Sequence, residues 1–247
     1  MAGPPAALAL DAVLCRHPGP EGGGGFEILV ERLQVHRGEA LALAGPSGAG
    51  KSTLLNLLAL ALRPASADRF ALNTRGGATI DLAALWRRRE EERLTATRAA
   101  HMGYVLQRGG LLPWLSVRRN IALSQAVLGR RDSARVVAVA ERLEIAALLD
   151  RMPATLSVGQ RQRVAIARAL AHRPEVVLAD EPTASVHPAL ADAVLALLIE
   201  QAREEDAALV LATHDPDRAA RHGFTIVKVE PAGPGRSRLL RAAAATA

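Results

Sequence analysis

The chain carries, between residues 45 and 53, the sequence Gly45-Pro46-Ser47-Gly48-Ala49-Gly50-Lys51-Ser52-Thr53. It matches the pattern G-x-x-x-x-G-K-[ST], whose glycines let the backbone turn so that successive N–H groups face one concavity. The apolar residues 40–44 predict a buried strand before this loop, and the leucine-rich residues 54–60 predict a helix after it. Phosphate binds where N–H groups gather at a helix N-terminus. We therefore predict that the whole loop binds a nucleoside triphosphate, with Lys51 on the β- and γ-phosphates and Ser52 on Mg²⁺.

The composition argues against a nucleic-acid-binding or membrane-spanning protein. Hydrophobic residues make up 49% of the 247 residues and aromatic residues 2%, while the net charge of +6 comes from arginines scattered along the chain. A nucleic-acid surface would gather this charge into a stripe with interleaved aromatics. No apolar run approaches the length of a membrane-spanning helix, about 18 residues, and we expect no signal peptide. Cys15 is the one cysteine, so no internal disulfide can form and a reducing compartment is expected. We therefore expect a soluble, cytoplasmic protein; if it works at a membrane, a partner must supply the spanning part.

Apolar runs alternate with helical patterns along the chain. Strands are expected at residues 8–14, 26–35, 102–106, 175–179, 208–212 and 224–229. Helical patterns are expected at residues 81–98, 117–149 and 188–202, and residues 63–77 are expected to be irregular. This alternation predicts an α/β fold with a mostly parallel sheet that is covered on both faces.

Two adjacent carboxylates follow another apolar run. Residues 176–179 predict a central buried strand, and Asp180 and Glu181 come directly after it. Ligands bind at the carboxyl ends of strands in open α/β sheets. We expect Asp180 to lie in the outer shell of Mg²⁺ and Glu181 to be the base that polarises the attacking water. Without the phosphate loop, an ordinary acidic turn would be the simpler interpretation.

The third motif is Leu156-Ser157-Val158-Gly159-Gln160, which precedes a helical stretch at residues 161–170. This motif resembles LSGGQ, the signature of the ATP-binding cassette (ABC) ATPases. The order of motifs also resembles that family: phosphate loop, Gln107 at a strand end, signature, paired carboxylates, and His214 at the next strand end. The resemblance covers about residues 8–230. Independently of it, Ser157 and the Gly159 amide at a helix N-terminus form a second anion site.

The resemblance implies a domain organisation. Residues 1–247 would form one ABC ATPase domain with a P-loop NTPase (RecA-like) core at about 8–105 and 165–230. An antiparallel β region would lie near the N-terminus, and a helical subdomain would be inserted at about 108–160. The Pro/Gly/Ala/Arg-rich residues 231–247 predict a mobile tail.

The resemblance also implies roles for single residues. Ser157, Gly159 and Gln160 of one subunit would close over the γ-phosphate that the other subunit holds, in a head-to-tail dimer with a second copy or a homologous ATPase subunit. Gln107 would contact Mg²⁺ and the attacking water, and His214 would hydrogen-bond the γ-phosphate. The catalytic set is then Glu181, His214 and Gln107. The remaining histidines are expected to be ordinary structural residues, at positions His17, His36, His101, His172 and His222.

The sequence departs from the family pattern at three places. Val158 replaces the first glycine of the signature, so altered contacts with the second copy are expected. His187 stands where the family usually has Asp, which bears on communication between the two ATP sites. An aromatic that stacks on adenine is missing at the end of the first strand, where the chain has Cys15-Arg16-His17. Either Arg16 or His17 stacks on the base instead, or adenine is held loosely.

The region after Gln107 bears on the type of ABC protein. Leu111, Leu112 and Trp114 suit either a socket for the coupling helix of a membrane subunit or the core of the helical subdomain. The chain looks most like the ATPases of lipoprotein-releasing and macrolide-export (MacB-like) transporters. The resemblance implies an ATPase with ATP and Mg²⁺ that powers a separate transmembrane permease, at the inner face of the membrane. The alternatives are an importer subunit and a nucleotide-gated interaction protein with weak hydrolysis, whereas a soluble DNA-repair or translation protein is disfavoured.

Overall fold

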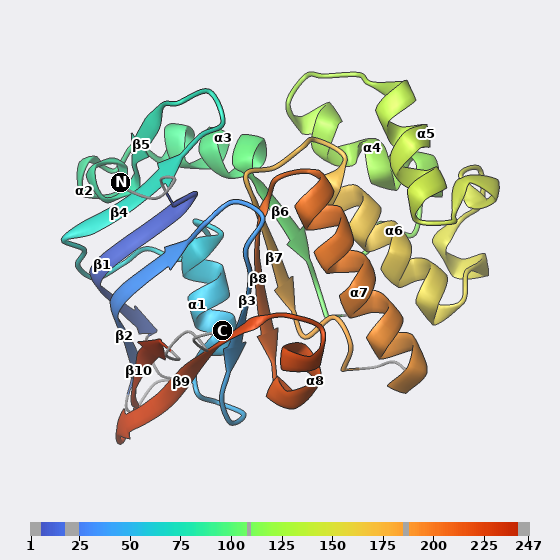
Figure 1. Cartoon of the computed structure of the whole chain (residues 1–247). Coiled ribbons are helices and arrows are strands. Elements are labelled where there is room, and N and C mark those ends of the chain that lie inside the picture. Colours follow the sequence, from blue (N-terminus) through green and yellow to red (C-terminus); the bar gives the residue numbers. More distant parts are fainter. Residues whose placement is uncertain (1–5, 18–24, 108–109, 185–187, 242–247) are drawn as a thin grey trace.

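The structure, a computed structural model, describes residues 6–17, 25–107, 110–184 and 188–241. In these ranges ten strands form one sheet in the order β5-β4-β1-β2-β10-β9-β3-β8-β7-β6, with helices packed on it (Figure 1). One half of the sheet is parallel and the other is largely antiparallel. The expected α/β P-loop NTPase fold is therefore confirmed.

The parallel half contains the strands that lead into the expected site. They are β3 (Ala40–Ala44), β6 (Met102–Val105), β7 (Val176–Asp180), β8 (Ala208–Thr213) and β9 (Thr225–Gly233). Every residue of β3 and β8 is buried, as continuous apolar runs predict for strands that are covered on both faces. Because these strands are parallel, the segments that follow β3, β6, β7 and β8 all leave the same edge of the sheet.

The helices divide into two layers because the side chains of a strand alternate between its faces. Leu41 and Leu43 of β3 pack with α1 (Lys51–Leu58), whereas Ala40 and Ala42 pack with α6 (Val158–Leu170) and α7 (Pro188–Glu204). The first layer also includes α2 (Leu82–Arg88) and α3 (Glu91–His101). The second also includes α4 (Val117–Val127), α5 (Ser133–Arg142) and α8 (Pro216–Arg221). Two short 3₁₀ turns lie at Ala146–Leu148 and Pro153–Thr155.

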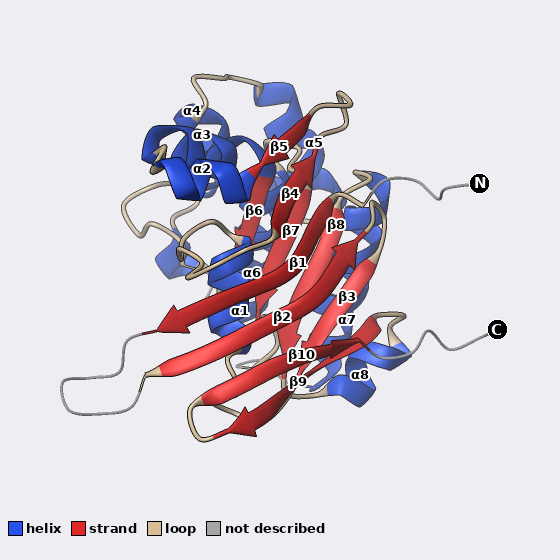
Figure 2. Ribbon diagram, turned by 90° about the vertical axis from the view of Figure 1, so that its left-hand side faces the viewer, coloured by secondary structure: helices blue, strands red, loops and turns tan. Residues whose placement is uncertain are grey.

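The antiparallel half curls over α1 in front of the parallel strands (Figure 2). It consists of β1 (Leu8–His17), β2 (Phe26–Val35), β4 (Arg69–Asn73) and β5 (Thr79–Asp81). The expectation of an irregular segment at 63–77 was wrong for residues 69–73, because Phe70 and Leu72 are buried against β1. The expected helix at 81–98 is broken where Arg89 adopts φ 56° between α2 and α3.

The C-terminal residues also differ from expectation. Instead of a mobile tail from residue 231, β9 continues to Gly233 and β10 (Arg236–Arg241) returns between β9 and β2. The side chains of Ser237 and Leu239 are buried there, which stabilises the strand. Residues 242–247 lie outside the described ranges. Among the described helices, none combines the length and apolar character needed to cross a membrane.

Candidate functional site

The phosphate loop closes around the ammonium group of Lys51. This side chain is only 6% exposed, and its Nζ donates hydrogen bonds to the carbonyl oxygens of Gly45 (2.8 Å) and Pro46 (3.1 Å). Gly48 and Gly50 have φ angles of 80° and 92°, which other residues rarely adopt. Gly45 packs so closely on β9 that a Cβ atom there would lie 2.4 Å from the carbonyl oxygen of Val229. The predicted glycines are therefore required by the geometry of the loop.

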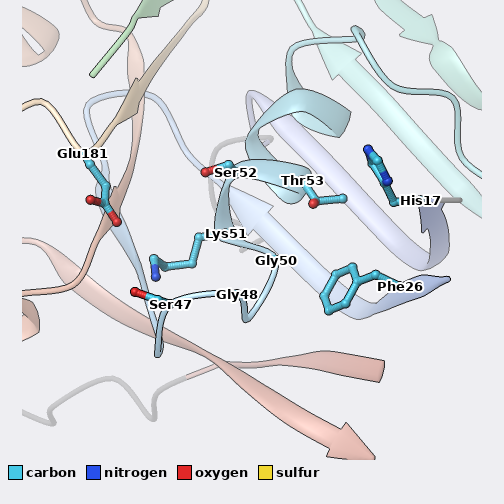
Figure 3. Close-up of a pocket in the computed structure, with 9 residues that line it drawn as sticks. All are labelled: His17, Phe26, Ser47, Gly48, Gly50, Lys51, Ser52, Thr53 and Glu181. Carbon is cyan, nitrogen blue, oxygen red and sulfur yellow. The ribbon is translucent and has the colours of Figure 1, made fainter. Parts of the chain in front are cut away.

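A cavity of about 440 Å³ opens beside this loop (Figure 3). Its lining comes from β1, β2, the phosphate loop, the start of α1 and the end of β7, and consists of His17, Phe26, Ser47, Gly48, Gly50, Lys51, Ser52, Thr53 and Glu181. Glu181 lies at one end, beyond Lys51, and the rings of Phe26 and His17 lie at the other. The cavity is therefore cationic at its centre, carboxylate-lined at one end and aromatic at the other.

Ser52 and Asp180, which are predicted to hold Mg²⁺, lie together where α1 faces the end of β7. The hydroxyl of Ser52 donates to Oδ1 of Asp180 at 3.1 Å. Burial raises the pKa of Asp180, as does the neighbouring Glu181 carboxylate, while the Ser52 hydrogen bond lowers it. A hard cation would favour the ionised carboxylate, and hydroxyl and carboxylate oxygens suit Mg²⁺. Among the described residues no cluster of three or more His, Cys, Asp or Glu side chains could hold a metal.

Glu181 and His214 lie at the ends of neighbouring strands. Asp180 of β7 pairs with Ala212 of β8, and the Glu181 N–H donates to the carbonyl of Ala212 at 3.1 Å. Glu181 has a φ of 41°, an uncommon conformation for a non-glycine residue that fixes where its side chain points. Its Oε2 lies 3.4 Å from Nδ1 of His214. The structure therefore brings together the predicted base and the predicted strand-end histidine.

The residues predicted to form a second anion site lie at the start of α6. The Ser157 hydroxyl accepts a hydrogen bond from the Gln160 N–H (3.2 Å), and Oε1 of Gln160 accepts one from the Ser157 N–H (2.9 Å). This capping box leaves the N–H groups of Val158 and Gly159 in the first helical turn, where no intrahelical acceptor exists. Neither these residues nor Gln107, which is exposed after β6, line the cavity at the phosphate loop. Within one chain, the predicted site residues are thus divided between separate places.

Sequence reasoning missed Phe26. It is the first residue of β2 and lies opposite His17 in register, so both rings reach the cavity from adjacent strands. The ring is so close to the phosphate loop that a Cβ on Gly50 would lie 2.5 Å from two of its carbons.

The three residues at the end of the first strand, of which Arg16 and His17 are the candidates for stacking on adenine, have different surroundings. Cys15 is fully buried, Arg16 pairs with Glu27 (2.6 Å), and His17 lines the cavity.

Comparison with known proteins identifies the family. A family model described as ABC transporter matches residues 31–184, which include the phosphate loop, Gln107, the signature and both carboxylates. The chain belongs to this family. His17, Phe26 and His214 lie outside the matched range. The chain is accordingly an ATP-binding, ATP-hydrolysing subunit of an ABC transporter.

Similar proteins include subunits of lipoprotein-releasing systems. The ATP-binding protein LolD of Paramagnetospirillum magneticum is 41% identical over 192 residues, or 76% of this chain and 80% of that protein. LolD of Bordetella pertussis is 41% identical over 205 residues, covering 81% and 84% of the two chains. An uncharacterized ABC transporter ATP-binding protein of Mycobacterium tuberculosis is 39% identical over 196 residues, covering 78% and 75%.

Solved ABC cassettes share the fold over most of the chain. The ATP-binding cassette MJ0796, in a dimeric post-hydrolysis state with ADP and phosphate, gives a TM-score of 0.74 at 28% identity, covering 95% of this chain and 98% of the other. CbiO1 from Clostridium perfringens, part of the cbiONQ transporter complex, gives 0.75 at 27% identity, covering 95% and 87%.

The remaining sequence expectations for this ABC cassette have mixed outcomes. The Trp114 side chain is 69% exposed, so the structure excludes it from the core of the helical region, whereas Leu111 packs partly against that core. His172 is buried and its Nε2 lies 3.1 Å from the Met102 carbonyl, as in an ordinary structural histidine. His187 lies outside the described residues.

Proposed function

We propose that this chain is the ATPase subunit of an exporter of the lipoprotein-releasing type, working as a head-to-tail dimer. The observation that carries the proposal is the division of the site: the phosphate loop and Glu181 form one cavity, while the N–H groups at the start of α6 lie elsewhere. A second copy in the opposite orientation would supply Ser157 and Gly159 to this cavity. The dimeric MJ0796 cassette and the LolD proteins support this arrangement and this transporter type.

The residues of the cavity suit phosphoryl transfer to water. Backbone N–H groups of residues 45–53 and the Lys51 ammonium would hold the β- and γ-phosphates. Ser52 and Asp180 would hold Mg²⁺, which supplies neutralisation of phosphate charge when bound. Glu181, held by its backbone and by His214, accepts a proton from the attacking water, and Gln107 orients that water. His214, whose side chain is 58% exposed, is placed to hydrogen-bond the γ-phosphate as well.

Val158 does not block the contact with the second copy in this proposal. Its side chain is 47% exposed at the start of α6, while the N–H groups of Val158 and Gly159 do not depend on side-chain identity. The β-branched side chain adds apolar surface where the family has glycine. Contacts with the second copy are therefore altered rather than lost.

The permease would dock at a second cavity, of about 240 Å³, between α3, β6, α4 and α6. Apolar groups such as Leu123, Val127 and Tyr104 line it, and its charged side chains, Arg98 and Arg168, are both cationic. Val127 is 67% exposed. We therefore expect this cavity to bind an apolar helix of a transmembrane subunit that carries a carboxylate. Binding of this helix would place the chain at the inner face of the membrane.

The dimer proposal is tested by the dependence of ATP hydrolysis on protein concentration. If both copies complete each site, turnover per chain rises with concentration and levels off once dimers predominate. Measurement of phosphate release over a wide range of protein concentration checks this. A constant turnover per chain, with monomers throughout in sedimentation, would contradict the two-copy site. ATP binding without turnover, even with the permease added, would instead favour a nucleotide-gated interaction protein.

The aromatic end of the cavity leads to a prediction for Phe26. We expect the adenine ring to stack on Phe26 beside His17, so Phe26→Ala weakens ATP binding about 10-fold, the loss of one base–aromatic stack. Phe26→Tyr keeps the ring and serves as the matched control. Calorimetric titration with ATP and with inorganic triphosphate checks the assignment. An equal loss of affinity for both ligands would show that Phe26 acts through the phosphate loop rather than on the base.

A further inference from the structure

The C-terminal half of α6 contacts the segment that follows Gln107. Nη1 of Arg168 donates a hydrogen bond to the carbonyl oxygen of Gly110 at 2.8 Å. The carbonyl of Arg168 in turn accepts a hydrogen bond from the Ser124 hydroxyl of α4 at 3.0 Å. Arg168 therefore lies where α6, α4 and the segment after β6 meet.

The backbone at Gly110 is adapted to this contact. Gly110 has φ 56°, and a Cβ atom there would lie 2.5 Å from Cδ1 of Leu106 and 3.7 Å from Nη2 of Arg168. Gly110 therefore packs closely against Leu106, the residue that precedes Gln107. Burial lowers the pKa of Arg168, so its guanidinium is partly removed from water, where a hydrogen bond to a carbonyl is stronger. Gln107 consequently lies between two fixed points, β6 on one side and the Arg168–Gly110 contact on the other.

The same helix starts at the second anion site. Ser157 caps α6, and Arg168 lies eleven residues further along, which corresponds to about 16 Å of helix. An α-helix of this length moves as a rigid body. A displacement at the Ser157 end is therefore carried to Gly110 and to the segment that contains Gln107.

From these contacts we infer that Arg168 is a positioning residue for Gln107, which ties the place of Gln107 to the position of α6. The inference rests on the proposed role of Gln107 in ATP hydrolysis. Arg168 does not line the cavity at the phosphate loop, so we expect it to act on Gln107 through its hydrogen bond to Gly110 rather than by contact with ATP. Arg168 also lines the cavity between α3, β6, α4 and α6, so a helix bound there would contact the same residue.

The test compares three full-length variants. Arg168→Met removes the hydrogen bond, and Arg168→Lys retains a cationic donor. Arg163→Met is the matched control, because Arg163 lies on the same helix and also donates to a backbone carbonyl, that of Leu143 at 3.1 Å. We expect Arg168→Met to lower kcat about 10-fold, the effect of losing one hydrogen bond from a charged group, with the Kd for ATP changed by less than about 2-fold. Arg168→Lys should recover part of this loss, and Arg163→Met should match the wild type.

Hydrogen–deuterium exchange provides a readout that does not depend on turnover. Peptides that span residues 104–115 should exchange about 10-fold faster in Arg168→Met, with and without a non-hydrolysable ATP analogue, because the segment opens more often. Unchanged exchange and unchanged kcat would overturn the inference. So would a loss of ATP affinity and thermal stability in parallel with kcat, since that pattern indicates general destabilisation. If the wild type itself fails to hydrolyse ATP, the proposed function fails, while the exchange comparison still decides on Arg168.

Discussion

Replacement of Glu181 by glutamine should lower the turnover of ATP by about 10³-fold, within the range for loss of a general base. Glutamine has the same shape as glutamate, so the backbone contact with Ala212 and the place of the side chain beside His214 are retained. The amide cannot accept a proton from the attacking water. ATP therefore stays bound and the dimer that encloses it persists.

Three measurements check this expectation. Phosphate release gives turnover, equilibrium titration gives the Kd for ATP, and sedimentation with ATP gives the dimer fraction. Glu144→Gln is the matched control, because Glu144 is an exposed carboxylate that pairs with Arg163 on the surface. Normal turnover in Glu181→Gln would contradict the assignment of the base. Loss of ATP affinity together with turnover would indicate that Glu181 serves mainly to shape the cavity.

The parallel half of the fold was predictable from the sequence for a simple physical reason. A strand that is buried on both faces needs an unbroken apolar run, and β3, β7 and β8 each have one. The polar residues that follow such runs lie at one edge of the sheet. The proximity of Ser52 to Asp180, and of Glu181 to His214, follows from this rule together with the order of the motifs.

Some features of the antiparallel half were less predictable because they depend on how its strands are placed in space rather than on a local sequence pattern. Nothing in the sequence near Gly50 indicates that the Phe26 ring lies against it; this contact depends on the curl that brings β2 over α1. Strand β10 is short and rich in arginine, and it is stabilised by burial between β2 and β9 rather than by its own pattern. Polar contacts between residues far apart in the sequence are also not predictable from a local sequence pattern. The buried carboxylate of Glu175 accepts hydrogen bonds from Arg37 and from the Arg75 N–H, at 2.9 Å each.

Loss of the Lys51 ammonium should have the second large effect. We expect Lys51→Ala to weaken ATP binding by about 100-fold or more. The variant removes a buried cation and its charge-assisted hydrogen bonds to the β- and γ-phosphates. Lys228→Ala is the matched control, since Lys51 and Lys228 are the two lysines of the chain and Lys228 is exposed on β9. Titration of each variant with ATP and with Mg²⁺–ATP measures the effect. Wild-type affinity in Lys51→Ala would contradict the assignment of the phosphate loop.

Lys51→Ala should also lower the thermal stability of the protein. Measuring unfolding with and without ATP distinguishes this effect from the loss of ATP binding. In the structure, Nζ donates to the carbonyl oxygens of Gly45 and Pro46, so the variant also loses two contacts that hold the loop closed. Thermal unfolding without nucleotide should therefore show a lower midpoint for Lys51→Ala than for Lys228→Ala. Added ATP should raise the midpoint of the control but not that of Lys51→Ala, because only a bound ligand stabilises the folded state. A loop that merely needs Lys51 to stay closed would still bind ATP once folded, and ATP would then raise both midpoints.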